Sequence, residues 1–95
     1  MTKKNFNFNY AFVFYDVNVR RVAKVFKICK KYLIHYQKSV FRGAITPSKM
    51  LSLKHELQQI IDKDEDFVCV VKLLNGNVFE EEVMGNQNSA ENLFL

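Results

Sequence analysis

Apolar residues divide the chain into extended and helical segments. Tyr10–Tyr15 is an apolar and aromatic run without polar alternation, which predicts a central strand covered on both faces. Phe67–Leu74 has the same character, and we expect a second buried strand there. Ile34–Ile45 is rich in β-forming residues and predicts one long or two short strands, with a bend or bulge at Lys38 or Gly43.

Two segments have apolar residues at the three-and-four spacing of an amphipathic helix. The first follows Asn18, which we expect to be its N-cap, and covers Val19–Leu33. The second follows Thr46 and Pro47, a cap and then a proline in the first turn, and runs to about Asp62. The side chains expected to face the core are Val22, Val25, Phe26, Cys29 and Leu33 in the first helix, and Met50, Leu53, Leu57, Ile60 and Ile61 in the second.

The last part of the chain predicts a turn and a short strand. Asn75-Gly76 is a two-residue hairpin signal, and Val78–Met84 would return as a strand whose three consecutive glutamates suit an exposed edge. The order of the main segments is βαββαβ. Its compact form is a ferredoxin-like α+β sandwich, with an antiparallel sheet and both helices on one face.

This architecture leaves one face of the sheet without a cover. Because the predicted strands are apolar on both faces, we expect a second copy of the chain to cover the open face, giving a homodimer packed sheet to sheet. Ninety-five residues suit a single domain. We assign it to residues 1–85 and predict that the mostly polar residues 86–95 form a flexible C-terminal tail.

Composition is that of an ordinary globular protein. Because we recognise neither a membrane span nor a secretory signal in the sequence, we expect the protein in the cytoplasm. No apolar run has the length of a membrane span, so we expect no membrane association. The apolar stretch after Lys3 and Lys4 lacks a cleavage site and is interrupted by Asp16, which argues against a secretory signal. Cys29 and Cys69 lie in apolar stretches without companion ligands, which favours buried free thiols over a metal site or a disulfide.

Charge is unevenly distributed along the sequence. Val17–Lys54 contains ten Lys or Arg residues and no Asp or Glu, whereas residues 55–95 contain nine acidic residues and two lysines. A surface of one sign repels itself and is stabilised by a partner of opposite charge, so the pattern favours a polyanion over a merely solvated helix surface. The basic residues that share one face of the first predicted helix are Arg20, Lys24, Lys27 and Lys31.

Candidate chemistry is sparse. The sequence contains no Gly-rich phosphate loop and no zinc or serine-hydrolase motif, and we expect His35 and His55 to be structural. The acidic run Asp62–Asp66 lacks the glycine and closing glutamate of a calcium loop, so we interpret it as a solvated turn. Asp16 ends the first strand, where the residues alone favour a cap for the following helix. A Mg²⁺ ligand, completed by its twin across a dimer axis, is the alternative.

Two stretches resemble the CRISPR adaptation family Cas-two (CRISPR-associated protein 2). One is the apolar strand that ends in Tyr15-Asp16 and is followed by a basic helix. The other is the run Gln-x-Ser-Val-Phe-x-Gly over residues 37–43, which begins about 20 residues later. Asp66 before the last apolar strand is similar too, and the resemblance spans roughly residues 9–85.

The resemblance implies a ferredoxin-like homodimer, often with the last strand lying on the partner's sheet. Members of the family sit between two dimers of the integrase Cas-one and hold a short DNA duplex during spacer acquisition. Members are also described as magnesium-dependent nucleases acting on RNA or DNA, with the strand-end aspartate, here Asp16, as the Mg²⁺ ligand. Ser39 and Phe41 correspond to residues associated with that catalytic site.

Two positions depart from the family pattern. His35 stands where the family often has Arg, and Arg42 stands where it often has Glu after the motif phenylalanine. The loss of an acid and the gain of a base at position 42 favour phosphate binding over a site built from several carboxylates.

We therefore expect an adaptor that holds nucleic acid, with double-stranded DNA as its ligand and RNA as an alternative. The alternatives to an adaptor are a magnesium-dependent endonuclease that uses Asp16, a related toxin-type ribonuclease, and an interaction module without nucleic acid. The expected protein partners are a second copy of the chain and the integrase Cas-one. The residues predicted to bind nucleic acid are Arg20, Arg21, Lys24, Lys27, Lys38 and Arg42.

Overall fold

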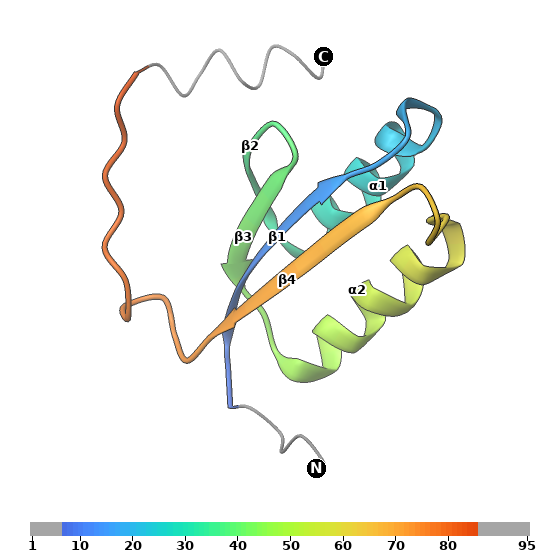
Figure 1. The fold of residues 1–95 in the computed structure, drawn as a ribbon. Helices are drawn as coiled ribbons and strands as arrows, with labels where there is room; N and C mark the ends of the chain where they lie inside the picture. The colour runs from blue at the N-terminus through green and yellow to red at the C-terminus, as the bar shows by residue number, and fades with distance from the viewer. Residues whose placement is uncertain (1–6, 86–95) are drawn as a thin grey trace.

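Six elements follow one another in the computed structural model, which describes residues 7–85 (Figure 1). The predicted tail, residues 86–95, lies outside the described residues. The predicted helix ends differ from the observed ones by at most two residues. In chain order the elements are β1 (Tyr10–Asp16), α1 (Val19–Tyr32), β2 (Ile34–Gln37), β3 (Val40–Ala44), α2 (Pro47–Ile60) and β4 (Phe67–Leu73).

The four strands form one antiparallel sheet in the order β2-β3-β1-β4. β1 pairs with β3 on one side and with β4 on the other, so its predicted central place is confirmed. Each helix connects two parallel strands across the strand between them. Because such crossovers have one hand, both helices lie on the same face of the sheet (Figure 1). This is the predicted ferredoxin-like arrangement.

The covered face of the sheet holds the core. Alternate residues of β1 (Ala11, Val13 and Tyr15) and Phe41 of β3 are nearly or fully buried. Both helices turn toward this face most of the stripe that the spacing predicted; Val22, also predicted to face the core, is only partly buried and lies outside it. The buried helix-side residues are Val25, Cys29 and Leu33 at α1, and Met50, Leu53 and Leu57 at α2, with Phe26, Ile60 and Ile61 packed at the margin.

Polar side chains cap both helices where the sequence predicted caps. Oδ1 of Asn18 accepts a hydrogen bond from the backbone amide of Arg20 at 2.9 Å. Oγ1 of Thr46 accepts one from the amide of Lys49 at 3.2 Å, and Pro47 is the first residue of α2. Each cap satisfies an amide that the first helical turn leaves unpaired.

The extended segment predicted over residues 34–45 is two strands joined by a sharp turn. The pairing of β2 with β3 shifts between His35 and Gln37, and Lys38 has a left-handed φ of 44°. Nε2 of His35 donates a hydrogen bond to the carbonyl of Lys38 at 2.9 Å and closes the turn. Lys38 is therefore the bend, in a backbone region that non-glycine residues enter rarely.

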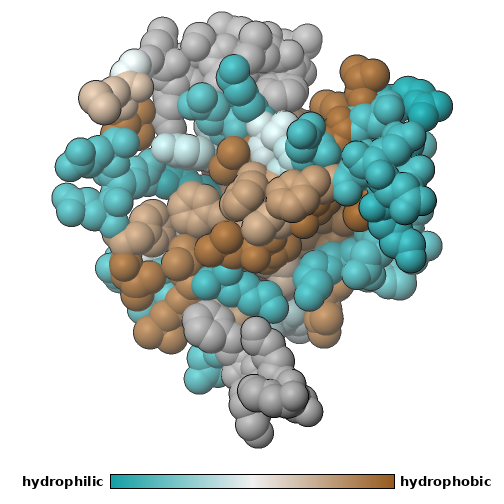
Figure 2. Space-filling view, in the orientation of Figure 1, coloured by the Kyte–Doolittle hydropathy of each residue, from teal (hydrophilic) through white to brown (hydrophobic). Residues whose placement is uncertain are grey.

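The opposite face of the sheet is open and apolar. β1 presents Phe12 and Phe14 on this face, and the register places Cys69 and Val71 of β4 beside them. Phe14 is 38% exposed and Val71 39%. Figure 2 shows a band of hydrophobic surface across this side of the molecule. The strands are thus apolar on both faces, as predicted, while the helices cover one.

Two predictions about the end of the chain are wrong. β4 is an edge strand and none of its residues is fully buried, because no further strand pairs with its outer edge within residues 7–85. Val78–Met84 forms no strand. The hairpin is not made because the amide of Asn77 donates to Oδ1 of Asn75 at 2.7 Å, a local turn that leads the chain away from β4.

The core assignment makes a direct prediction. Leu53→Ala removes a fully buried side chain and should lower the free energy of unfolding by about 2–5 kcal/mol. The measurement is urea denaturation at a fixed protein concentration. Leu51→Ala is the matched control: Leu51 lies on the same helix but is 66% exposed, so its loss should cost about 0.5 kcal/mol or less. Equal losses in the two variants would contradict the assigned helix face.

Candidate functional site

Asp16 lies at the carboxyl end of β1, opposite Phe67 of β4. Its side chain is exposed, and its carboxylate forms no hydrogen bond or ion pair with the residues 7–85 that the structure describes. The cap favoured for Asp16 from the sequence is therefore wrong, because Asn18 caps α1 instead. Asp16 remains a carboxylate directed to solvent at the end of a central strand.

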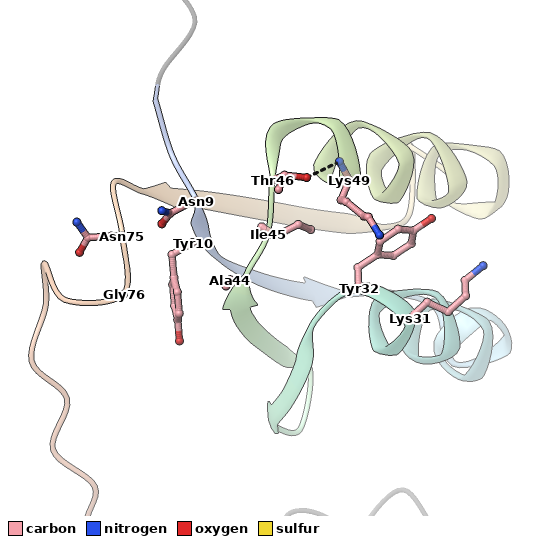
Figure 3. A pocket seen from close by; sticks show the side chains of 10 residues that line it. All are labelled: Asn9, Tyr10, Lys31, Tyr32, Ala44, Ile45, Thr46, Lys49, Asn75 and Gly76. Atoms are coloured by element: carbon pink, nitrogen blue, oxygen red, sulfur yellow. Dashed lines mark hydrogen bonds between the residues drawn. The ribbon is translucent and has the colours of Figure 1, made fainter.

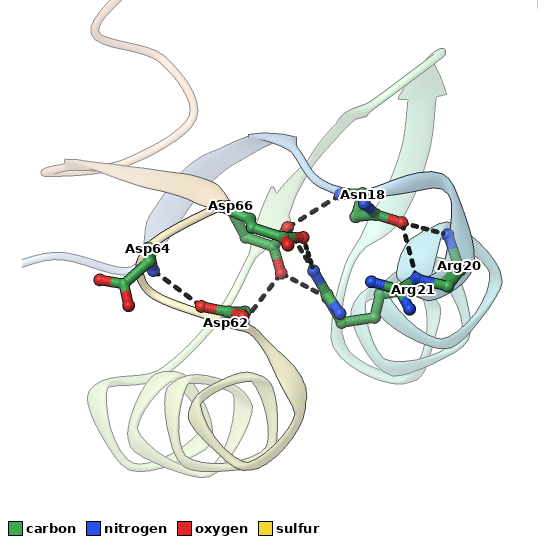
Figure 4. Close-up of polar contacts among 7 residues, drawn as sticks. Asn18, Arg20, Arg21, Asp62, Asp64 and Asp66 are labelled. Atoms are coloured by element: carbon green, nitrogen blue, oxygen red, sulfur yellow. Dashed lines mark hydrogen bonds and ion pairs between the residues drawn. The ribbon is translucent and has the colours of Figure 1, made fainter.

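Asp66 organises the neighbouring loops (Figure 4). Its side chain has no exposed surface, and its oxygens accept hydrogen bonds from the amide of Asn18 at 2.8 Å and the amide of Asp62 at 2.9 Å. Nε and Nη2 of Arg21 donate to it at 2.6 and 3.2 Å. The acidic run is therefore not simply a solvated turn, since its last residue ties the start of β4 to the β1–α1 connection that follows Asp16.

The electrostatics of Asp66 follow from these contacts. The hydrogen bond from Arg21 is the main cause that holds the pKa of Asp66 well below its usual range, and the backbone amides of Asp62 and Asn18 act in the same direction. Burial opposes this shift. The carboxylate is therefore charged at any pH near neutrality.

The two adjacent arginines have different roles in the structure. Arg21 also donates from Nη2 to Glu65 at 2.6 Å, and its side chain is 17% exposed. Arg20 is exposed, and its Nε donates to Oδ1 of Asn18 at 3.2 Å. The sequence contained one signal that an arginine pairs with an acid, since the two arginines and the acidic loop carry opposite charges. The two residues that meet, Arg21 and Asp66, lie 45 positions apart in the chain.

The other predicted nucleic-acid residues fall into three places. Lys24 and Lys27 are exposed on α1, together with Arg20. Lys38 lies in the β2–β3 turn, and Arg42 lies on β3, where its Nη1 donates to Glu81. The structure thus brings four of the six onto α1, where Arg21 is held by Asp66 and the other three are exposed, and places Lys38 and Arg42 elsewhere. Lys31, which shares the basic stripe, pairs with Glu56 of α2 at 2.5 Å.

Ser39 and Phe41 support the end of β1 in different ways. The carbonyl of Ser39 accepts a hydrogen bond from the amide of Tyr15 at 3.1 Å, which places Ser39 one residue from Asp16 along the strand pair. The ring of Phe41 is fully buried, 6.4 Å from the ring of Tyr15 and 5.2 Å from that of Phe26. Phe41 therefore acts on this region through packing.

Two buried polar groups lie beneath the site. The hydroxyl of Tyr15 is buried, and burial is the main reason that its pKa is raised far above the ordinary value, while the neighbouring side chain of Ser39 acts in the opposite direction. Burial also raises the pKa of the Cys29 thiol to about 12. Both groups are protonated near neutral pH, so neither is an activated nucleophile. Cys29 and Cys69 are free thiols; Cys29 is fully buried as predicted, whereas Cys69 is only partly buried.

The residues around Asp16 fit a divalent cation only in part. Within residues 7–85, the structure contains no group of three or more His, Cys, Asp or Glu side chains that could hold a metal ion. Mg²⁺ is commonly bound by one or two carboxylates and several waters. One chain supplies a single carboxylate here, that of Asp16. A second Asp16, brought close by another copy of the chain, would complete such a pair.

A cavity of about 640 Å³ lies at the other end of β1, away from Asp16 (Figure 3). Tyr10 and Tyr32 lie on opposite sides of Ala44 in this view, and Lys49 extends from α2 toward Tyr32. None of the predicted site residues lines this cavity. Within the described part of the chain, neither helix is long and apolar enough to cross a membrane.

Comparison with known proteins gives a consistent result. A family model described as "CRISPR associated protein Cas2" matches residues 9–81. The chain is 40% identical over 76 residues to "CRISPR-associated endoribonuclease Cas2 2" of Archaeoglobus fulgidus, covering 80% of this chain and 83% of the relative. It is 42% identical over 76 residues to "CRISPR-associated endoribonuclease Cas2" of Thermotoga maritima, covering 80% and 87%.

Solved structures agree with these relatives. A crystal structure titled "Crystal structure of cas2" is 37% identical, with a TM-score of 0.78 over 85% of this chain and 91% of that one. Cas2 of Streptococcus pyogenes at pH 6.5 is 33% identical, with a TM-score of 0.70 over 80% of this chain and 99% of that one.

The Asp66 contacts predict a pH-dependent stability. Because folding depresses the pKa of Asp66, the stabilisation is complete above the pKa of an unfolded aspartate, about 3.9, and is lost as the pH falls below it. Asp66→Asn should therefore lower the urea midpoint at pH 7, and the difference from wild type should shrink below pH 4. Denaturation curves from pH 3 to 7 measure this.

Asp64→Asn is the matched control for this prediction. Asp64 is exposed in the same loop, and its own amide donates to Oδ1 of Asp62 at 2.9 Å. The substitution should leave the midpoint close to that of wild type. A loss at Asp64 as large as that at Asp66 would mean that loop charge, rather than the Arg21 contact, stabilises the fold.

Proposed function

The chain belongs to the CRISPR-associated Cas2 family, and from this premise we propose that it is an adaptor of CRISPR adaptation. A homodimer holds the protospacer DNA duplex between dimers of the integrase Cas-one during spacer acquisition, in the cytoplasm. The observation that carries the proposal is the distribution of charge. α1 carries exposed Arg20, Lys24 and Lys27 and no acidic residue, and it follows β1, which ends in the exposed carboxylate of Asp16.

The basic side of α1 supplies the proposed contact with DNA. Lys24 and Lys27 are exposed and form no ion pair with the described residues, so binding a phosphate breaks no contact within the chain. Such contacts fix the position of a duplex without reading its sequence, which suits an adaptor that must accept many spacers. Their free energy comes largely from counterion release, so affinity should fall steeply with salt.

The open sheet face supports the proposed homodimer. Phe14 is 38% exposed on this face and lies between Val40 of β3 and Cys69 of β4, in an apolar surface that a monomer would leave in water (Figure 2). Packing two such faces together buries this surface and gives a two-fold, self-complementary contact. It would also bring the strand ends of two copies, and their Asp16 side chains, into one assembly.

A second candidate function is metal-dependent cleavage of RNA or DNA. The curated relatives are named endoribonucleases, and Asp16 is an exposed carboxylate free to bind Mg²⁺. When bound, Mg²⁺ would supply a Lewis acid and an activated water. In this chain Asp16 would hold the ion, Ser39 would lie beside it and Phe41 would support the strand.

The proposed dimer predicts the effect of a charge on the open face. Phe14→Glu should convert the dimer to a monomer, because a buried carboxylate without a partner is costly at an apolar contact. Sedimentation velocity measures the mass, and circular dichroism verifies the fold. Leu51→Glu, at a side chain 66% exposed on α2, is the control and should remain dimeric. A dimer that persists in Phe14→Glu would place the contact elsewhere.

The proposed adaptor is tested by spacer integration with the integrase Cas-one. Lys24→Ala/Lys27→Ala should reduce duplex affinity, reduce the log–log salt slope by about two and impair integration, because two phosphate contacts are lost. Asp16→Asn should integrate normally. Duplex binding is measured by fluorescence anisotropy over a salt series.

The matched control for this experiment removes a charge away from α1. Lys63→Ala lies in the exposed acidic loop and should leave the slope and the integration yield unchanged. If Asp16→Asn abolishes integration while the dimer stays folded, the carboxylate has a role in integration, and the adaptor proposal, which gives it none, is wrong. Mg²⁺-dependent cleavage that is lost in Asp16→Asn and kept in Asp64→Asn would favour the nuclease.

A further inference from the structure

Arg20 stands in the first turn of α1, where a positive charge is unfavourable. The amides at this end of a helix carry partial positive charge, and the first turn of α1 contains no acidic residue. The neighbouring Arg21 is compensated by Asp66, whose carboxylate lies 2.6 Å from its Nε. Arg20 is exposed and forms no ion pair with any residue from 7 to 85. Its charge is therefore left for an anion that binds from solution.

The side chain of Asn18 holds Arg20 in one orientation (Figure 4). Its Oδ1 accepts two hydrogen bonds, one from the backbone amide of Arg20 at 2.9 Å and one from Nε of the same residue at 3.2 Å. Because both partners are donors, the oxygen of the asparagine side chain must face them rather than its nitrogen. The cap of α1 thus makes a second contact, with the guanidinium, which capping alone does not require.

Asn18 is itself fixed through its backbone. Its amide donates to Oδ1 of Asp66 at 2.8 Å, and its carbonyl accepts a hydrogen bond from the amide of Arg21 at 2.8 Å. The side chain of Asp66 has no exposed surface, and it also accepts from Nε of Arg21 and from the amide of Asp62. A residue held at both its amide and its carbonyl has little freedom to move. The side chain of Asn18 is therefore a fixed support for Arg20.

The contact with Asn18 leaves most of the guanidinium available. Arginine has five N–H donors in one plane, and among the described residues only the donor at Nε of Arg20 is bound. The terminal nitrogens, Nη1 and Nη2, carry the other four donors and can bind two oxygens of one phosphate. An exposed arginine loses side-chain freedom when it binds a ligand, and this loss weakens binding. At Arg20 part of that freedom is already lost in the free protein.

We propose that Asn18 is a positioning residue for DNA, which orients the guanidinium of Arg20 so that Nη1 and Nη2 meet one phosphate of the duplex backbone. Asn18 does not touch the phosphate itself. The inference rests on the proposed binding of DNA and adds the residue that prepares one of its contacts. α1 lies on the covered face of the sheet, opposite the face assigned to the homodimer, so that dimer leaves Arg20 accessible (Figure 1).

The test is the substitution Asn18→Ser. Serine is as good an N-cap as asparagine, so α1 keeps its cap, but the serine oxygen is one bond closer to the backbone and does not reach Nε of Arg20. Binding to a mixed-sequence DNA duplex is measured by fluorescence anisotropy over a salt series. Affinity should fall about three-fold, because the freedom of one arginine is then lost on binding. The log–log salt slope should not change, since the same phosphates are contacted.

A second variant tests the same contact in the opposite direction. Asn18→Asp keeps the cap and the length of the side chain, but its carboxylate forms an ion pair with Arg20 and competes with the phosphate. It should weaken binding more than Asn18→Ser does and reduce the salt slope by about one. A slope equal to that of wild type would mean that Arg20 does not contact the duplex, and would overturn the inference.

Arg20→Ala separates positioning from a purely structural role. It should weaken binding and reduce the slope by about one, because one phosphate contact is lost. In that background Asn18→Ser should have no further effect on affinity, since the two residues act through one contact and their effects do not add. Thr46→Ser is the matched control, because it exchanges the cap of α2, whose oxygen accepts from the amide of Lys49, and should leave DNA affinity unchanged. Urea midpoints verify that all variants are folded.

Three further outcomes decide between this inference and its alternatives. Equal affinities of wild type and Asn18→Ser would overturn the inference. Additive losses in the double variant Asn18→Ser/Arg20→Ala would overturn it too, because Asn18 would then act through the fold of the loop and not through Arg20. Wild-type protein without salt-dependent DNA binding would instead defeat the proposed function itself, before any variant is compared.

Discussion

Two helices cannot cover both faces of this sheet, and much of the structure follows from that constraint. Each helix crosses from one strand to a parallel strand two places away, and crossovers of one hand put both on the same face. That face carries the core, while the other keeps an apolar surface around Phe12 and Phe14. Phe79, from the segment after β4, packs against Phe12 and covers part of this surface, and we assign the remainder to a second copy of the chain.

The acidic half of the sequence neutralises selected residues of the basic half. Asp66 and Glu65 hold Arg21, Glu56 holds Lys31, and Glu81 holds Arg42. Three cations, Arg21, Lys31 and Arg42, thereby join elements of the fold. Three others, Arg20, Lys24 and Lys27, lie exposed on α1 and form no ion pair with the described residues, so an external polyanion meets no internal competitor there. Net charge alone does not distinguish these groups, since both contribute equally to it.

Sequence patterns predicted most of the fold, because they act over a few residues. The caps at Asn18 and Thr46, the buried stripes of both helices and the central place of β1 all follow from neighbouring residues. The same reasoning failed for Asp16 as a cap, because Asn18 stands closer to the first helical turn. It also failed for Val78–Met84, where the side chain of Asn75 turns the chain before a hairpin can form.

The candidate site shows where sequence alone was sufficient and where it was not. The sequence by itself determined that an aspartate ends an apolar strand, that a basic helix follows it and that acids gather later, because these are properties of local order. Only the tertiary structure decided which arginines are already paired. Arg21 meets Asp66 across 45 positions and Arg42 meets Glu81 across 39, and contacts at such separations depend on how the strands and loops pack rather than on any local pattern.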